Sequence, residues 1–509
     1  MRRFLRWLAC GMCVACSVSG EPTGDFPRSR GEQAGSGGKS AVAGSSNGGS
    51  SDAGSSRLPA GAGGEAPSSD AGTDPGEAGT APGSNAGGEG GAAASIPPET
   101  SDAGSGPTVI TGLEKTGPYP ETTYPKENPY AADKALLGKI LFWEEQLSSH
   151  DTHACGTCHR AAAGGSDPRA AAGGPLGAGP NGIFGDADDA RGSAGVVRCD
   201  SAGEPKADPV YALTVQITPR KAPSALDAWL FDALFWDGRA STTFVDPVTG
   251  TVAIESGGAL ENQAAAPPVS SVEMSCEGYS WEAIASKLAV ATPLKLASQI
   301  PDAIAQAIGE HPSYPALFEW VYGTPEISAR RVLFAIATYE RQLRSDQTPW
   351  DRFNAGEVEA LTPDQQAGLA VFNVKARCAK CHAPPLFTDN KFHNIGAQAP
   401  DLDIGRAAIS GDPADAGKMK TPSLRNVGLR AASGLLHWGA DRGATLRSVL
   451  DTYRQGGTQH ENTDPEILPL NMPDYEFEQL LDFLQHGLTD PRAQAELPPF
   501  DRPRLGSER

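Results

Sequence analysis

Two Cys-x-x-Cys-His motifs constrain the fold of this chain more than any other sequence feature. They are Cys155-Gly156-Thr157-Cys158-His159 and Cys378-Ala379-Lys380-Cys381-His382. This spacing attaches a c-type haem, because the two thiols add across the porphyrin vinyl groups and the following histidine becomes an axial iron ligand. We therefore predict two covalently bound haems, with His159 and His382 as iron ligands, and a fold that encloses both.

A zinc site and a redox-active dithiol are the alternative interpretations of these cysteines. A zinc ribbon needs the two cysteine pairs close together and gives no reason for a histidine directly after each pair. A redox dithiol also leaves both histidines unexplained. Covalent haem accounts for both cysteines and the histidine of each motif.

Composition separates the N-terminal part of the 509-residue chain from the rest. Residues 17–111 are mainly Gly, Ala, Ser and Pro with scattered acids, and large apolar side chains are almost absent. Such a stretch buries too little surface to offset the entropy of ordering, so we predict a disordered tether. Folded protein is expected from about residue 112 to about residue 500.

Residues 1–16 have the features of an export signal. Three arginines lie within residues 2–6, and residues 4–15 form an apolar run that is too short to span a bilayer as a mature helix. Val14-Ala15-Cys16 resembles a bacterial lipobox, with Cys13 where leucine is usual. We expect export in a Gram-negative bacterium, either as an outer-membrane lipoprotein tethered through lipidated Cys16 or as a free periplasmic protein.

The remaining cysteines and the net charge limit what else the chain can do. Of nine cysteines, three lie in the signal and four in the haem motifs, which leaves Cys199 and Cys276. In an oxidising compartment these two are a candidate disulfide, and two unrelated free thiols are the alternative. The formal net charge of −20 argues against nucleic-acid binding and permits attraction to basic redox partners.

Helical periodicity dominates the folded part, and strand patterns are few and short. Apolar residues recur at helical spacing over 136–141, just before the first motif. Further helices are expected at 281–290, 301–308, 327–343, 362–374, 445–456 and 475–486, with threonine N-caps at 362 and 445. We predict a mainly α protein with long loops, in which two c-type cytochrome domains, 112–347 and 348–500, each wrap around one haem and join near residues 344–351.

A series of short motifs lies between and after the haem motifs. In chain order they are Phe235-Trp236-Asp237-Gly238-Arg239-Ala240, Gln263, Val272-Glu273-Met274, Tyr339-Glu340-Arg341, Phe387-Thr388-Asp389, Phe392-His393-Asn394, Pro422-Ser423-Leu424-Arg425-Asn426 and Tyr453-Arg454-Gln455-Gly456-Gly457. In residue type and order they resemble the bacterial dihaem cytochrome c peroxidase family, which includes MauG, over residues 118–490. The resemblance implies a peroxide-reacting N-terminal haem and an electron-transferring C-terminal haem.

The resemblance also implies catalytic roles for three side chains. Glu273 and Gln263 match the distal pocket of the peroxide-reacting haem, where a carboxyl group can move a proton between the two peroxide oxygens. Trp236 matches the tryptophan between the two haems. The alternatives are a surface glutamate, a loop glutamine and an aromatic core residue. No histidine occurs between His159 and His311, so we expect the N-terminal haem iron to be five-coordinate or water-bound.

The second haem needs a ligand opposite His382. Residues His437-Trp438-Gly439 resemble a segment that the family has before its ligand to the second haem. The helix that follows them brings Tyr453 to a matching ligand position. MauG has a tyrosine ligand on its second haem. Tyr453 shares one helical face with Leu446 and Leu450, which directs the phenol inward. Met419 is the rival ligand, and a buried tyrosine with an ordinary hydrogen bond is the remaining alternative.

The chain departs from the family where an interhaem calcium ion is usual. Lys221, in Arg220-Lys221-Ala222-Pro223, replaces the asparagine of the calcium site, and residues 431–434 differ from the family's Thr-Ala-Pro segment. Both departures count against calcium between the haems. An apparent insertion that includes residues 246–250 lies between Trp236 and Gln263 and can reshape the mouth of the pocket.

These features predict an exported enzyme that reduces hydrogen peroxide to water. Electrons are expected from a small redox protein, either a cytochrome or a cupredoxin. The alternative is a MauG-type enzyme that oxidises tryptophan or tyrosine on a partner protein. A non-catalytic dihaem electron carrier is the third interpretation, and Glu273 and Gln263 argue against it.

Overall fold

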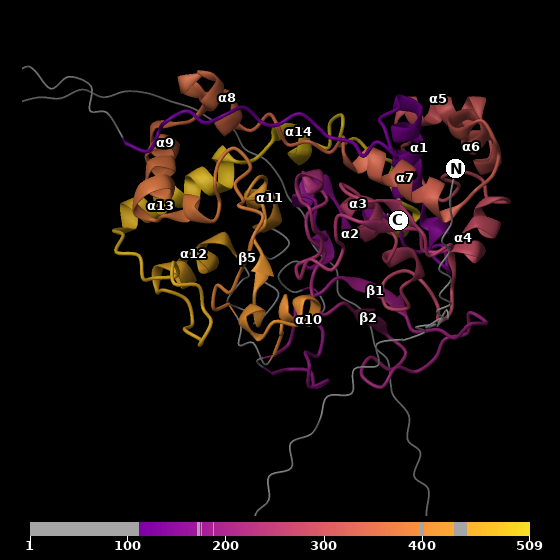
Figure 1. Cartoon of the computed structure of the whole chain (residues 1–509), viewed down its shortest axis with the longest axis horizontal. Coiled ribbons are helices and arrows are strands. Elements are labelled where there is room, and N and C mark those ends of the chain that lie inside the picture. Colours follow the sequence, from indigo (N-terminus) through magenta and orange to yellow (C-terminus); the bar gives the residue numbers. More distant parts are fainter. Residues whose placement is uncertain (1–110, 171–173, 175, 187, 398–401, 432–444) are drawn as a thin grey trace, which may run out of the picture. The chain divides into compact units, whose positions relative to one another are not determined.

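Helices joined by long loops form the part of the chain that the structure describes (Figure 1). The computed structural model describes residues 111–509, apart from 171–173, 175, 187, 398–401 and 432–444. The predicted signal, Cys16 and the tether lie outside these residues. Within the described part, no helix is both long and apolar enough to cross a membrane. The predicted mainly α fold class is confirmed, whereas the wrapping of each domain around a haem stays a prediction.

The N-terminal part, residues 111–347, contains the first motif and most of the strands. Its helices are α1 (Ala132–Phe142), α2 (Cys155–Cys158), α3 (Ala259–Ala264), α4 (Trp281–Leu288), α5 (Asp302–Glu310), α6 (Tyr314–Tyr322) and α7 (Ala329–Glu340). Two antiparallel hairpins are formed by β1 (Ala194–Val197) with β2 (Val215–Ile217) and by β3 (Phe244–Val245) with β4 (Val252–Ile254). The predicted insertion at residues 246–250 is the turn of the second hairpin.

The C-terminal part, residues 348–509, contains the second motif. Its helices are α8 (Pro349–Ala355), α9 (Pro363–Ala370), α10 (Ala407–Ser410), α11 (Val427–Ala431), α12 (Leu446–Arg454), α13 (Asp474–Asp482) and α14 (Pro491–Gln494). A short hairpin pairs β5 (Phe392–His393) with β6 (Met419–Lys420). Turns of π-helix, Val371–Lys375 and Phe483–Gly487, extend α9 and α13.

Every helix predicted from periodicity is present, with ends that differ by a few residues. The threonine N-caps are confirmed, because Thr362 Oγ1 accepts from the N–H of Gln365 and Thr445 Oγ1 accepts from the N–H of Ser448. Two longer helices, α6 and α8, were not predicted. Packing also continues past residue 500, the predicted end, since Leu505 is fully buried.

The largest hydrophobic cluster centres on the packed pair α1 and α7. Leu137, Ile140 and Leu141 of α1 are fully buried in it. Gly138 allows the close approach, because a Cβ at this position would lie 1.9 Å from the carbonyl oxygen of Ala335. A second cluster in the C-terminal part is built on Phe372, Phe387, Phe477 and Phe483, so each motif lies beside its own core.

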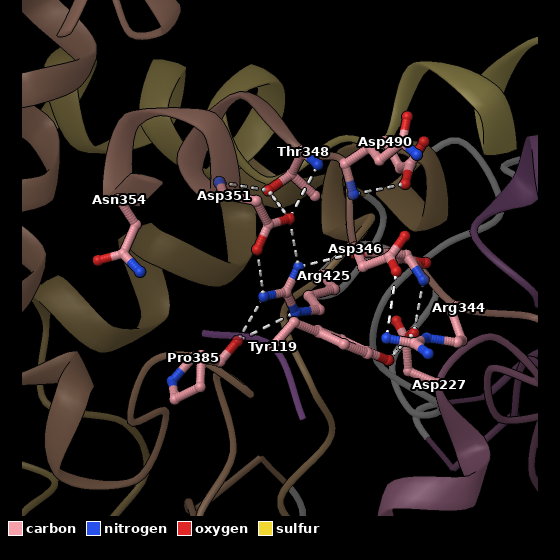
Figure 2. Close-up of polar contacts among 12 residues, drawn as sticks. Tyr119, Asp227, Arg344, Asp346, Thr348, Asp351, Asn354, Pro385, Arg425 and Asp490 are labelled. Carbon is pink, nitrogen blue, oxygen red and sulfur yellow. Dashed lines mark hydrogen bonds and ion pairs between the residues drawn. The ribbon is translucent and has the colours of Figure 1, made fainter. Parts of the chain in front are cut away.

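A buried polar network joins the two parts at the predicted connection (Figure 2). The fully buried Arg425 donates from both terminal nitrogens to the carboxylate of Asp351, at 2.8 Å each, and also donates to the carbonyl oxygen of Pro385. Tyr119 donates to Asp227 at 2.6 Å in the same network. Buried charges are tolerated here because each finds a partner. Pro385 closely follows His382, so the network anchors the loop after the second motif.

Candidate functional site

The two motif histidines are held in the same way. The Nδ1 atom of His159 lies 3.1 Å from the carbonyl oxygen of Gly165, and that of His382 lies 3.0 Å from the carbonyl oxygen of Phe387. Because a carbonyl only accepts, Nδ1 must be the donor in both rings, which leaves each Nε2 lone pair for a metal. Burial lowers the pKa of both imidazoles, that of His382 to about 4, so both rings are neutral near pH 7.

The cysteines divide as the sequence predicted. Cys155, Cys158, Cys378 and Cys381 form no disulfide, whereas Cys199 and Cys276 are bonded to each other. The disulfide is thereby confirmed and the alternative of two free thiols is wrong. Among the described residues, no cluster of metal-binding side chains contains cysteines from both motifs, as a zinc ribbon would require.

A cavity of about 250 Å³ lies beside the second motif. Cys378, Cys381 and His382 line it, and apolar side chains such as Phe231, Leu234, Phe372, Leu424, Leu450 and Leu484 form much of the wall. A planar apolar group attached through two thiols and ligated by one histidine fits this donor set and this wall. The residues of the second motif therefore fit a covalently bound haem.

Both candidate ligands opposite His382 face this cavity. Tyr453, on α12, and Met419, on β6, line it together with His382. No hydrogen bond joins the Tyr453 hydroxyl to a described residue, and its role as an iron ligand stays a prediction. Burial raises the pKa of Tyr453, and the nearby thiols of Cys378 and Cys381 raise it further. The segment at residues 437–439 lies outside the described residues.

Trp236 lies at the same cavity and bonds to both parts of the chain. Its indole Nε1 donates to the carbonyl oxygen of Lys221 at 3.0 Å, and its own carbonyl oxygen accepts from the N–H of Lys420 at 2.8 Å. The first contact is to the N-terminal part and the second is to β6. Its predicted role between two cofactor sites stays a prediction.

Glu273 lies close to the first motif. Its half-buried carboxyl acts electrostatically on Cys158, and its pKa is raised by burial, with Arg239 and Ser270 opposing that shift. Gln263 is half-buried at the end of α3, and its side chain makes no hydrogen bond to any described residue. The structure thus brings Glu273 to the motif, and the roles of both side chains stay predictions.

The segment that carries Glu273 is fixed by its neighbours on both sides. The N–H of Val196, on β1, donates to the carbonyl oxygen of Val272 at 3.0 Å. A Cβ on Gly195 would lie 1.9 Å from the same oxygen, so only glycine permits this approach. The disulfide then ties Cys199, just beyond β1, to Cys276 at the other end of the segment.

Several charged residues near the motifs were missed by sequence reasoning. Arg169 donates to the Sγ atom of Cys158 at 3.1 Å and pairs with the fully buried Asp167. At the cavity, burial lowers the pKa of Lys221 and of Lys420 to about 7. Lys221 was predicted to place an ammonium near the family's calcium position, but Lys420, whose ammonium lies 3.2 Å from the ring centroid of Phe231, had no sequence signal.

Comparison with known proteins finds one family and several relatives that are similar in sequence. Residues 132–359 match the sequence profile of the family described as di-haem cytochrome c peroxidase. The chain is 29% identical over 398 residues to the methylamine utilization protein MauG of Methylorubrum extorquens, which covers 77% of this chain and 89% of that protein. It is 26% identical over 400 residues to the cytochrome-c peroxidase IdrP1 of Pseudomonas sp. strain SCT, covering 72% and 84%.

A solved structure shares the fold. A MauG-like protein associated with microbial copper homeostasis superposes with a TM-score of 0.53 at 24% sequence identity. The match covers 75% of this chain and 96% of that one. At this level of identity the likeness is to the fold alone.

Proposed function

This chain belongs to the di-haem cytochrome c peroxidase and MauG family, and we propose that it is an exported enzyme that reduces hydrogen peroxide to water. Two electrons from a small redox protein and two protons convert one peroxide to two waters. The burial of the Glu273 carboxyl near Cys158 supports this proposal most directly, because an electron carrier needs no acid–base group beside its cofactor.

Two c-type haems are the cofactors of this family, and the motifs supply the residues that would hold them. Cys155, Cys158 and His159 would hold one haem, and Cys378, Cys381 and His382 the other. When bound, the haems supply the redox-active iron that takes up electrons and cleaves the oxygen–oxygen bond of peroxide. We further propose that each haem organises its own domain, with the boundary near the Arg425–Asp351 ion pair.

Glu273 would serve as the acid–base group for peroxide. Its carboxylate oxygen would take the proton from one peroxide oxygen and return it to the other, which becomes water. A carboxyl group whose pKa is raised by burial is suited to both steps, because it can accept and release a proton nearer to neutral pH. Gln263, with its side-chain amide unbonded to the described residues, would orient the peroxide by hydrogen bonding.

Trp236 and Tyr453 would define the electron route. The Trp236 indole bonds to Lys221 in the N-terminal part, its backbone bonds to Lys420 in the C-terminal part, and the residue lines the cavity of the second motif, so its indole would relay electrons between the two sites. Tyr453 would ligate the second iron through a phenol oxygen, a hard donor that favours the ferric state.

Modification of a protein substrate is the second candidate function. The unbonded Tyr453 phenol at the cavity favours it, because a phenolate ligand would let the second site hold oxidising equivalents rather than only pass electrons. A relative at 29% identity is named a MauG protein, which agrees with this alternative. In that case the partner would be a protein that presents tryptophan or tyrosine.

Export and membrane attachment belong to the same proposal. The arginine-flanked apolar run at residues 1–16 would direct export, and lipidation of Cys16 would tether the enzyme to the outer membrane through residues 17–111. Labelling with a palmitate analogue, lost in a Cys16→Ser variant, would distinguish a lipoprotein from a free periplasmic protein.

Stopped-flow addition of peroxide to the diferric enzyme, with and without reduced small cytochrome c, tests the main proposal. We expect rapid oxidation of the cytochrome and a loss of roughly a hundredfold or more in the Glu273→Gln variant. Glu282→Gln, on the exposed face of α4, is the matched control and should react like the wild type.

Each other outcome has a defined meaning. A spectral change that persists in the presence of reduced cytochrome would favour modification of a protein substrate instead. No spectral change with peroxide would contradict both enzyme proposals and leave the electron carrier.

A further inference from the structure

A loop between the first haem motif and β1 gathers three carboxylates. Gly177 and Ala190 exchange two backbone hydrogen bonds, of 2.8 and 2.9 Å, and so close the loop that precedes β1. Asp186, Asp188 and Asp189 each place one carboxylate oxygen within 4.8 Å of the others. Like charges this close repel unless a proton or a cation lies between them.

Asp189 provides an independent indication of a missing partner. Its side chain is only 5% exposed, and its Oδ2 atom accepts from the N–H of Gly185 at 2.9 Å. The other oxygen, Oδ1, is buried and has no hydrogen-bond donor among the described residues. A buried carboxylate oxygen without a partner is strongly unfavourable, so the fold at this point is incomplete without a positively charged group.

No cationic side chain of the described part fills that role. None of the three aspartates forms an ion pair with a described lysine or arginine. Asn181 instead holds two of them together, because its Nδ2 donates to Asp186 at 2.7 Å and to Asp188 at 3.0 Å.

We propose that Asp186, Asp188 and Asp189 bind a calcium ion. The three side chains offer carboxylate oxygens, and hard oxygen donors favour Ca²⁺ over zinc or copper. The ligands come from a short irregular loop, which suits the flexible coordination of Ca²⁺ better than the strict octahedron of Mg²⁺. The site is separate from the interhaem position, where Lys221 stands.

The site has a structural consequence for the proposed active site. The loop leads directly into β1, whose Val196 supports the carbonyl oxygen of Val272 beside Glu273. A bound ion would fix the entry into β1 and thereby the support of the segment that carries Glu273. Calcium would then stabilise the enzyme without touching either cofactor.

Isothermal titration of the full-length diferric enzyme with calcium chloride tests the proposal. We expect binding of a single ion in the roughly 10⁻⁴–10⁻³ M range typical of extracellular sites, and affinity at least about tenfold weaker in Asp186→Asn and in Asp189→Asn. Asp412→Asn is the matched control, since Asp412 is exposed and caps a turn in the C-terminal part. Calcium should also raise the midpoint of thermal unfolding of the wild type and of the control.

Two results would overturn the proposal. One is the absence of binding by the wild type at millimolar calcium, and the other is unchanged affinity in both aspartate variants, which would place any bound ion elsewhere. If Asp189→Asn fails to fold, Asp186→Asn decides alone, because Asp186 is exposed and its replacement removes only one carboxylate.

Discussion

The backbone N–H of Lys420 donates a hydrogen bond of 2.8 Å to the carbonyl oxygen of Trp236. These residues are far apart in sequence, and the bond joins the loop after β2 to the hairpin strand β6. The Trp236 indole also bonds to Lys221, so the side chain is held from the N-terminal part and the backbone from the C-terminal part. These two bonds restrict the position of the residue that we propose to carry electrons.

Replacement of Trp236 by phenylalanine should slow turnover without unfolding the protein. Phenylalanine keeps an aromatic ring but loses the hydrogen bond to Lys221, which costs about 1 kcal/mol of folding free energy. We expect peroxide-driven oxidation of reduced cytochrome to slow by roughly tenfold, equivalent to about 1.4 kcal/mol of activation free energy. Stopped-flow spectroscopy measures this rate.

The matched control is Trp320→Phe, since Trp320 lies on α6, is exposed and stacks on His311. Equal rates in wild type and Trp236→Phe, at equal haem content, would remove Trp236 from the electron route.

Replacement of Tyr453 by methionine should raise the reduction potential of the second haem. A thioether stabilises ferrous iron relative to a phenolate, so we expect an upward shift of roughly 100 mV or more in a spectroelectrochemical titration. Tyr475→Met, on the exposed face of α13, should leave the potential unchanged. If Met419→Leu shifts the potential and Tyr453→Met does not, Met419 is the ligand.

Local signals predicted much of this fold, and long-range contacts account for what was missed. The Thr362-Pro363 start and the Thr445 cap depend on residues three positions apart, and both helices were predicted. The same threonine–proline signal at Thr348-Pro349 begins α8, but these residues were predicted to belong to the connection between the two domains. Arg425 and Asp351 are far apart in sequence, so no local pattern could pair them.

The candidate site divides in the same way. The motif cysteines and histidines are fixed by covalent chemistry, and their spacing identifies them directly. By contrast, the support of the Glu273 segment by β1, and the orphaned oxygen of Asp189, arise only when distant backbone segments pack together. Family resemblance could indicate Glu273, whereas it gave no indication of the aspartate loop.

Glu340 should make folding stability fall as the pH rises. Its carboxyl is 4% exposed, one oxygen has no hydrogen-bond partner among the described residues, and burial raises its pKa to about 8. An unfolded glutamate has a pKa of about 4.3, so between about pH 4.3 and 8 the folded state holds a proton that the unfolded state releases. The free energy of unfolding therefore decreases with pH by up to about 1.4 kcal/mol per unit in this window.

The Glu340→Gln variant tests this effect, because glutamine is neutral in both states. We expect it to match the wild type near pH 4 and to exceed its unfolding free energy by up to about 5 kcal/mol near pH 8. Chemical denaturation across this pH range provides the measurement. Glu319→Gln, on the exposed surface of α6, should follow the wild-type profile. Parallel profiles for wild type and Glu340→Gln would show that Glu340 ionises normally.

Loss of the Cys199–Cys276 disulfide should affect the proposed active site more than it affects the fold. The bond closes a segment with a sequence separation of 77, and its removal is expected to cost about 4 kcal/mol or less through the entropy of the unfolded chain. It also releases one end of the segment that carries Glu273. We therefore expect the Cys199→Ser/Cys276→Ser variant to react with peroxide more slowly even where it is fully folded.

A destabilised control separates the two effects. Ile304→Ala, at a fully buried position on α5, should cost about 2–5 kcal/mol while leaving the Glu273 segment intact. At a temperature well below both unfolding midpoints, the control should react with peroxide at the wild-type rate and the disulfide variant should not. If both variants react at the wild-type rate, the contacts from β1 alone position Glu273, and the disulfide contributes only to stability.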